Sequence, residues 1–354
     1  IGLGIPAEPL FRSSIQEGGA KVNAKTANFE YATALFRIFP KFGVSIGLVP
    51  YTNVGYSYHT TQRIGTSSTT STMTFSGSGG LRQAYIGLGY EFFKGFSLGA
   101  NVSYFWGDYE RKIGVTSSDA YVNVLTKTYG AEISSYKLDF GMQYKQALSK
   151  SDALTVGATF GLGHKLNADP WLSVTNIDTQ TGVSAYSADT ITNGLSIPMT
   201  IGGGIAYCHK NSLTVGADYQ LMRWGSESFP IVNENTDKYE LVNNYYMDRH
   251  KVTVGADWIP NPMSRRFLNR VHRRIGASYA TPYYKINGQD GPKEMTVSAG
   301  FAIPLVNSWN NRSVLNVSFQ WANLSAKNLV TENSFRVTIG LTFNERWFAK
   351  WKVD

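Results

Sequence analysis

The chain has 354 residues, which is enough for two ordinary soluble domains or for one large barrel. Charged residues make up 16 % of it, below the usual quarter or so. Its 33 Lys and Arg exceed its 25 Asp and Glu by eight, a modest and dispersed positive charge that argues against a nucleic-acid partner. A single Cys excludes a disulfide framework. The sequence has no run of about 18 apolar residues, so it predicts no transmembrane helix.

Apolar and polar residues alternate along most of the chain. Between Phe335 and Phe343 every odd position is apolar, and every even position is polar or glycine. A strand with one apolar face requires this period of two. Fourteen segments follow it, at about 1–16, 25–39, 42–59, 78–92, 95–113, 129–147, 152–170, 191–208, 212–225, 240–259, 273–287, 292–304, 313–324 and 332–343. The sequence therefore predicts an all-β protein, and an even strand number suits a closed antiparallel barrel.

The connections between these segments alternate in length. Tight turns such as Pro40-Lys41 and Lys94-Gly95 form one set. The other set includes long stretches rich in Ser, Thr, Gly and Asn at 60–77, 114–128, 171–190 and 226–239. Short turns on one side and long loops on the other are typical of outer-membrane barrels, in which the short turns are periplasmic.

A barrel of about fourteen strands is too wide for side chains to fill, so we expect its apolar face to contact lipid and its polar face to line the lumen. The prediction is a transmembrane antiparallel β-barrel over 1–343 in the outer membrane of a Gram-negative bacterium. It would contact membrane lipids and lipopolysaccharide, with periplasmic termini and a periplasmic tail at 344–354. Aromatic residues near the strand ends predict two interfacial girdles. The loop-side girdle comprises Tyr56, Tyr58, Trp106, Tyr109, Trp224, Tyr283 and Tyr284.

Two stretches resemble a known family. With the fourteen predicted strands, FGVSIGLVPYTNVGY at 42–56 and NERWF at 344–348 resemble the Bacteroidota branch of the FadL/TodX/OmpP1 outer-membrane proteins. The resemblance implies passive passage of hydrophobic molecules, fatty-acid-like or aromatic, through a lateral opening at a kinked third strand. The family's N-terminal hatch is not recognisable here, because Ile1 already lies in a predicted strand. Ile1 in place of Met is expected of a mature or truncated product.

Some Bacteroidota relatives look like accessory subunits of the barrel-assembly (BAM) machinery, which gives an alternative function. The channel hypothesis predicts an apolar pocket inside the barrel, beside the lateral opening. The alternative, a non-transporting accessory subunit of an outer-membrane protein assembly complex, predicts a filled or blocked lumen and a flank buried against a partner. A general porin would need an open, charged pore, and the low charge content argues against it.

Pro50 lies in the middle of the third predicted strand and is followed by Asn53 and Gly55. Proline has no N–H and cannot complete a β-ladder, so we expect the wall to be bulged or open at Pro50. One interpretation of these three residues is a lateral gate for an apolar ligand. The other is a β-bulge that adjusts the curvature of the wall.

Charged residues recur on the predicted lumen face. The candidate polar residues are Lys137, Asp139, Asp218, Glu294 and Arg336. They would form either a polar path for a solute or an internal network of ion pairs that braces the barrel. Both signs occur in similar number, which favours the network.

Basic and aromatic residues gather on the predicted periplasmic side. The candidate contacts for a partner or for lipid headgroups are Arg265, Arg266, Arg270, Arg273 and Arg274 in one turn, and Trp347, Phe348 and Trp351 in the tail. The alternatives are a solvated loop and a tail that packs under the barrel rim.

An enzymatic role has little support. The five His residues are scattered, and none belongs to an HExxH or other metal-binding spacing. No GxSxG elbow is present. We therefore expect no catalytic residues, metal or cofactor.

Overall fold

The computed structural model describes residues 2–17, 20–27, 31–66, 68–233, 236–261, 263–286, 288–306, 312–326 and 331–344. These residues form β-strands joined by turns, loops and two single-turn 3-10 helices. None of their helices has the length and apolar content needed to cross a membrane.

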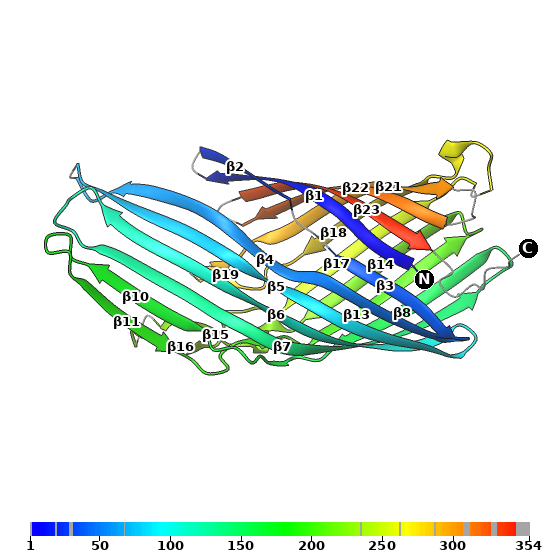
Figure 1. Ribbon diagram of the computed structural model, residues 1–354, viewed down its shortest axis with the longest axis horizontal. Helices are drawn as coiled ribbons and strands as arrows, with labels where there is room; N and C mark the ends of the chain where they lie inside the picture. Colours follow the sequence, from blue (N-terminus) through cyan, green and yellow to red (C-terminus); the bar gives the residue numbers. More distant parts are fainter. Residues whose placement is uncertain are drawn as a thin grey trace, which may run out of the picture.

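The wall of the molecule is one antiparallel sheet that closes on itself (Figure 1). Its strands are β1 (Gly2–Glu17), β2 (Ala20–Ala27), β3 (Ala32–Phe39), β4 (Phe42–Arg63), β5 (Thr70–Phe93), β6 (Phe96–Ser117), β7 (Val124–Ala147), β8 (Asp152–Gly161), β13 (Thr200–His209), β14 (Leu213–Met222), β17 (Arg249–Trp258), β18 (His272–Ala280), β21 (Lys293–Val306), β22 (Arg312–Ser325) and β23 (Thr331–Asn344). Closure comes from β1, which pairs with β23 on one side and with β2 and β3 on the other. Because β2 and β3 occupy one position, the described wall has the fourteen positions that the sequence predicts.

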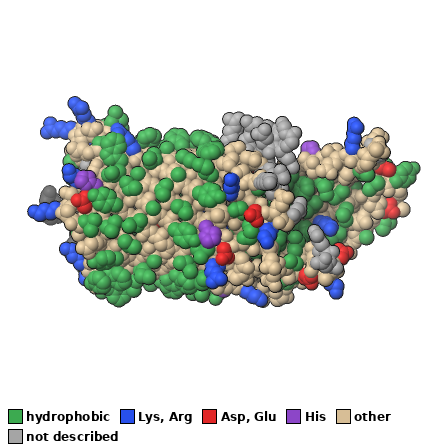
Figure 2. Space-filling view, turned by 180° about the vertical axis from the view of Figure 1, so that it is seen from behind, with side chains coloured by type: hydrophobic (Ala, Val, Ile, Leu, Met, Phe, Trp, Pro, Cys, Tyr) green, Lys and Arg blue, Asp and Glu red, His purple; other side chains and the backbone are tan. Residues whose placement is uncertain are grey.

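The outer surface of this wall is apolar, and the inner surface is polar or small. Large apolar side chains such as Ile46, Ile86, Val102, Phe140 and Val254 are exposed on the outside. On the face seen in Figure 2, hydrophobic side chains cover a wide band of the molecule, and Lys and Arg side chains gather at one end. The segment Phe96–Trp106 has the length of a tilted transmembrane strand, ~9–11 residues. The transmembrane β-barrel is confirmed, and Gly2 faces Asn344 across a ladder at the short-turn end.

Four neighbouring strands continue well beyond the apolar belt. β4 to β7 are 22 to 24 residues long, whereas β8, β13, β14 and β17 have 10 residues each. On the outer face the belt ends at Asp108 and Glu132, which lie opposite each other on β6 and β7. From Glu132 to Val124, β7 continues for about 26 Å beyond the belt at ~3.3 Å per residue.

A hairpin of β10 (Trp171–Ile177) and β11 (Ser184–Thr190) extends this projecting sheet through pairing of β10 with β7. The expectation of an irregular loop over 171–190 is therefore wrong. Residues 226–239 likewise contain most of a second hairpin, of β15 (Phe229–Asn233) and β16 (Lys238–Val242). β11 has few apolar residues, and all of its residues are exposed, because neither of its faces lies in lipid.

Three strands are irregular at the level where the barrel wall becomes the projecting sheet. β4 shifts register against β5 between Pro50 and Thr52. On β5 and β6, Gly79 and Gly107 adopt φ of 113° and 145°, in the region that favours glycine. A Cβ at Gly107 would collide with the Gly80 carbonyl oxygen of the neighbouring strand. The glycines permit the close approach of strands that this change of direction needs.

The segments that connect β8 to β10 and β11 to β13 bulge into the barrel. They carry the two-residue strands β9 (His164–Lys165) and β12 (Ser196–Ile197), which pair with each other. Their side chains join residues of the inner wall in a buried apolar cluster of Leu81, Phe105, Ala131, Ile133, Leu166, Ala168 and Ile197. Phe105 is fully buried there. This cluster, the inner core, packs part of the lumen with apolar side chains.

Candidate functional site

Pro50 lies where the ladder on one side of β4 stops. β3 pairs with β4 up to Leu48, and from Val49 onward the described residues pair β4 only with β5. Tyr51 is the extra residue of the register shift, and its ring stacks on Phe105 with 5.5 Å between centroids. A β-bulge changes the direction in which the neighbouring side chains point. The shift therefore turns Tyr51 toward the inner core.

Asn53 and Gly55 follow on β4, opposite Gly80 and Ser78 of β5. A Cβ at Gly55 would meet no heavy atom within 4 Å, so this position is open. The three candidate gate residues thus lie along one edge of β4. Their role as a gate remains a prediction.

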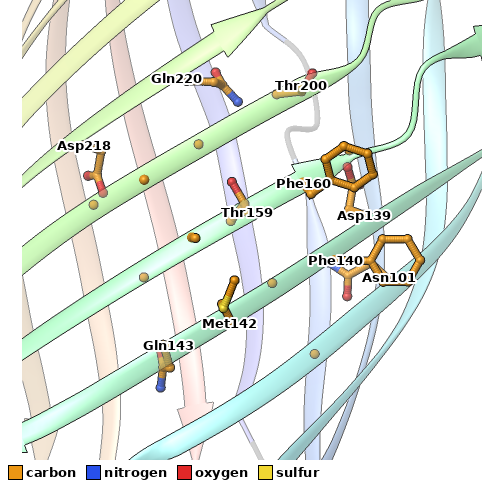
Figure 3. Close-up of a pocket in the computed structure, with 18 of the residues that line it drawn as sticks. Asn101, Asp139, Phe140, Met142, Gln143, Thr159, Phe160, Thr200, Asp218 and Gln220 are labelled. Carbon is orange, nitrogen blue, oxygen red and sulfur yellow. The ribbon is translucent and has the colours of Figure 1, made fainter.

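A cavity of about 990 Å³ occupies the lumen beside this wall. Lys137, Asp139, Asp218 and Lys251 lie on its lining, with Asn, Gln and Thr side chains between them. Figure 3 shows Asp139, Gln143, Thr159, Asp218 and Gln220 on neighbouring strands of this wall. Lys137 Nζ and Asp139 Oδ2 are 2.5 Å apart. Tyr51, Ile197 and Met222 also line the cavity, so an apolar ligand there would meet both charged and apolar groups.

The other candidate lumen residues lie apart from this cavity. Glu294 on β21 forms an ion pair with Arg249 on β17, with 2.6 Å between Oε2 and Nη2. The Arg249 guanidinium lies 5.4 Å from the centre of the Tyr283 ring. Arg336 is on β23, opposite Gln320 of β22. The Arg249–Glu294 pair reaches across β18, which lies between its two strands, and the Lys137–Asp139 pair lies within β7. The network interpretation of these residues stays a prediction.

Loops on the β14–β21 side fill the loop-side part of the lumen with aromatic rings. Trp224, Phe229, Tyr245, Tyr246, Tyr283 and Tyr284 stack on one another with centroids 4.2 to 6.3 Å apart. Tyr239 on β16 reaches the opposite wall, where its ring lies 6.2 Å from that of Tyr129 on β7. We call these residues the aromatic cluster. It crosses the lumen between two walls.

Burial accounts for the electrostatics of the aromatic cluster. It raises the pKa of Tyr284 to about 12, and it raises the pKa of the adjoining Tyr109 to about 12 as well. Trp224, Tyr283 and Tyr284 do not form part of the loop-side girdle, and for these three residues the prediction is wrong. They pack against other loop residues because the loops fold inward. The signal in the sequence is the Tyr-Tyr pair in each of two long loops.

The arginine-rich turn between β17 and β18 is a long projection at the short-turn end. Arg273 stacks on Trp258, with 4.8 Å from its guanidinium carbon to the ring centre. Arg274 Nε donates to Asp257 Oδ2 at 2.8 Å. Between these anchors, the side chains of Met263 and Leu268 are 88 % and 67 % exposed.

Arg265 and Arg266 are exposed on this turn, and Arg270 is partly exposed. Every other short turn in the described ranges also carries a basic residue, namely Lys41, Lys94, Lys150 and Lys210. The short-turn end is therefore a basic rim with one apolar projection. Trp347, Phe348 and Trp351 lie outside the described residues.

Among the described residues, no group of three or more His, Cys, Asp or Glu side chains is arranged to hold a metal ion. The described residues thus provide a register shift in the wall, a cavity with a mixed polar and apolar lining, an aromatic cluster and a basic rim.

Comparison with known proteins identifies the family. A family model described as BamG matches residues 11–354. The chain belongs to the BamG family. No curated protein matches it.

Solved structures with the same fold include three FadL-type barrels. The Pseudomonas putida toluene transporter TodX is 13 % identical, with a TM-score of 0.63 over 99 % of this chain and 90 % of its own. A Pseudomonas aeruginosa FadL homologue is 11 % identical, with a TM-score of 0.66 over 97 % and 89 %. The Ralstonia pickettii toluene transporter TbuX is 13 % identical, with a TM-score of 0.61 over 98 % and 89 %. The expected FadL-type fold is confirmed, and the Bacteroidota branch remains a prediction.

Proposed function

We propose that this BamG-family barrel is a non-transporting accessory subunit of an outer-membrane protein assembly (BAM) complex. The observation that carries the proposal is the occupied lumen. The aromatic cluster crosses it, the inner core packs against one wall, and the cavity between them is lined by Lys137, Asp139 and Asp218. A hydrophobic molecule in this cavity would displace water from the Lys137–Asp139 pair and from Asp218, which costs free energy.

The family and the arginine-rich turn support the same function. The family name, BamG, points to the BAM machinery. The resemblance to accessory subunits implies the same partner. Interfaces between proteins favour Arg, Met and Phe at their centres. Arg265, Arg266 and Arg270 stand beside the exposed Met263 and Leu268, in a turn that extends past the apolar belt. With periplasmic termini, this turn faces the periplasm and fits an acidic surface of a partner.

Affinity purification of the native protein from membranes in mild detergent tests the proposal, with mass spectrometry of proteins and lipids. We expect an assembly-machine barrel and lipoproteins in stoichiometric amounts. Reversing Arg265, Arg266 and Arg270 to Glu should reduce that recovery by about tenfold, as loss of interface arginines does. The matched control reverses Lys41, Lys94 and Lys150 to Glu, with the same change in net charge, and should retain the partners. Purification without a stoichiometric protein contradicts the proposal.

Passive passage of hydrophobic molecules is the second candidate, and the register shift at Pro50 favours it. Among the described residues, β3–β4 pairing ends at Leu48, so a solute could leave sideways into lipid. Uptake of labelled oleate or toluene by proteoliposomes tests this function. Transport by the wild-type protein that falls on Pro50→Ala would support it. Equal uptake by protein-free liposomes would exclude it.

A further inference from the structure

The far end of the projecting sheet exposes apolar side chains where no lipid can cover them. The side chains of Tyr121, Val183 and Tyr186 are 78 %, 65 % and 69 % exposed. They lie beyond the charged pair Asp108 and Glu132 that ends the apolar belt, roughly 20–30 Å farther along the strands. Isolated exposed apolar residues are ordinary, but several at one loop end indicate a contact surface.

This end is held in one conformation by hydrogen bonds between two loops. The Thr179 hydroxyl and the Gln180 amide both donate to the Ala120 carbonyl oxygen, at 2.5 Å and 2.7 Å. Asp119 accepts from the Tyr121 N–H at 3.0 Å, and Asp178 accepts from the Gln180 N–H at 2.8 Å. A surface ordered before binding loses little conformational entropy when a partner arrives.

β11 forms the border of this end and is an unprotected sheet edge. In the described part of the chain it pairs only with β10, and all of its residues, Ser184–Thr190, are exposed. Sheet edges are commonly blocked by Lys, Pro or a bulge. β11 has no Lys, Pro or bulge and a single charged residue, Asp189. Its free backbone groups can therefore accept another strand.

The charge of this end selects the kind of strand. Residues 117–123 and 176–190 contain Asp119, Asp178 and Asp189 but no Lys, Arg or His, in a chain with a net charge of +8. The backbone N–H of Gln180 and that of Thr181 lower the pKa of Asp178, so its carboxylate stays ionised at neutral pH. The local charge is opposite to that of the basic rim at the other end of the barrel.

We propose that β11 and the adjoining loop tips bind an extended, basic segment of a partner protein, which adds to the sheet as a further strand. Backbone hydrogen bonds along β11 would hold the segment, and Tyr186 and Val183 would contact its apolar side chains. Asp189 and the two loop carboxylates would pair with its Lys or Arg. This surface is distinct from the arginine-rich turn of the proposed function, and the inference stands on the geometry of this end alone.

Peptide binding to the full-length protein in detergent micelles tests the proposal by fluorescence anisotropy. The probe is a labelled peptide of alternating Val and Thr with two Lys at each end, and the control peptide carries Glu in place of Lys. We expect the Lys peptide to bind more weakly as salt rises and the Glu peptide not to bind. Equal binding of the two peptides, or no binding of the Lys peptide, overturns the proposal.

Variants distinguish the effect of blocking the β11 edge from the effect of added positive charge. Ala188→Lys places a blocking residue on β11 and should weaken the Lys peptide by about tenfold. Thr175→Lys, on the paired strand β10, makes the same change of charge without blocking the edge and should weaken it by about threefold or less. Tyr186→Ser removes an exposed ring and should weaken binding severalfold. Unchanged affinity in Ala188→Lys would refute strand addition, whatever the co-purification experiment finds.

Discussion

Replacement of Phe105 by Ala measures how tightly the inner core is packed. Phe105 is fully buried, and its ring stacks on Tyr51. A buried aromatic side chain removes ~150 Å² or more from water, worth about 4 kcal/mol at ~25 cal/mol per Å². The Ala side chain retains a small part of this burial free energy, and the cavity that the ring leaves behind costs a similar small amount. We therefore expect Phe105→Ala to lower the free energy of unfolding by about 3–5 kcal/mol.

Equilibrium unfolding in urea, with the barrel in lipid vesicles and tryptophan fluorescence as the signal, provides the assay. Phe105→Leu is the matched control, because it nearly conserves volume and should cost about 1.5 kcal/mol or less. The slope of the unfolding free energy against urea should stay the same in both variants. A loss below about 1 kcal/mol for Phe105→Ala would mean that the ring faces an open lumen, and the reasoning from an occupied interior would fail.

Two further predictions concern the wall and the short-turn end. Gly107→Ala should destabilise the barrel by about 1–3 kcal/mol, because Ala at a φ of 145° is strained and its Cβ would collide with the Gly80 carbonyl oxygen. The control variant Gly89→Ala has ordinary geometry and should cost less than about 1 kcal/mol in the same unfolding assay. Hydrogen bonds from Ser149, His209 and Tyr207 lower the pKa of Asp152, so its stabilising effect is present above the unfolded pKa near 4 and is lost as pH falls below it. Unfolding midpoints between pH 2 and 6 should therefore depend less on pH in Asp152→Asn than in the wild-type protein.

Strands with one face in lipid could be predicted, and strands with both faces in water could not. Phe96–Trp106 alternates clearly because lipid selects apolar residues at every second position. β11 consists of Ser, Ala, Tyr, Asp and Thr, all exposed, so nothing selects a period of two. Its strand conformation comes from pairing with β10, which in turn pairs with β7. Such pairing is a long-range contact that local pattern does not record.

The candidate site was predictable where a single residue type dictates geometry. Pro50 lacks an N–H, and the ladder does shift register next to it. That the shift aims Tyr51 at Phe105 depends on three strands meeting at one level. The aromatic cluster depends on two loops that are more than thirty residues apart, as in the Trp224–Tyr283 contact. No local pattern specifies that these loops fold into the lumen instead of out over the rim.

The interior of this barrel, and not its wall, decides between the two functions. A shared fold carries many functions, so similarity to toluene transporters at 13 % identity specifies the wall alone. A hydrophobic molecule in the lumen cavity would displace water from the Lys137–Asp139 pair, which costs free energy, while Tyr51, Ile197 and Met222 offer it apolar contacts. A subunit has no such constraint, since paired charges and stacked rings inside the barrel stabilise a rigid scaffold. The same scaffold holds a basic rim at one end and an acidic sheet edge at the other, which are the two places where partner proteins should be sought.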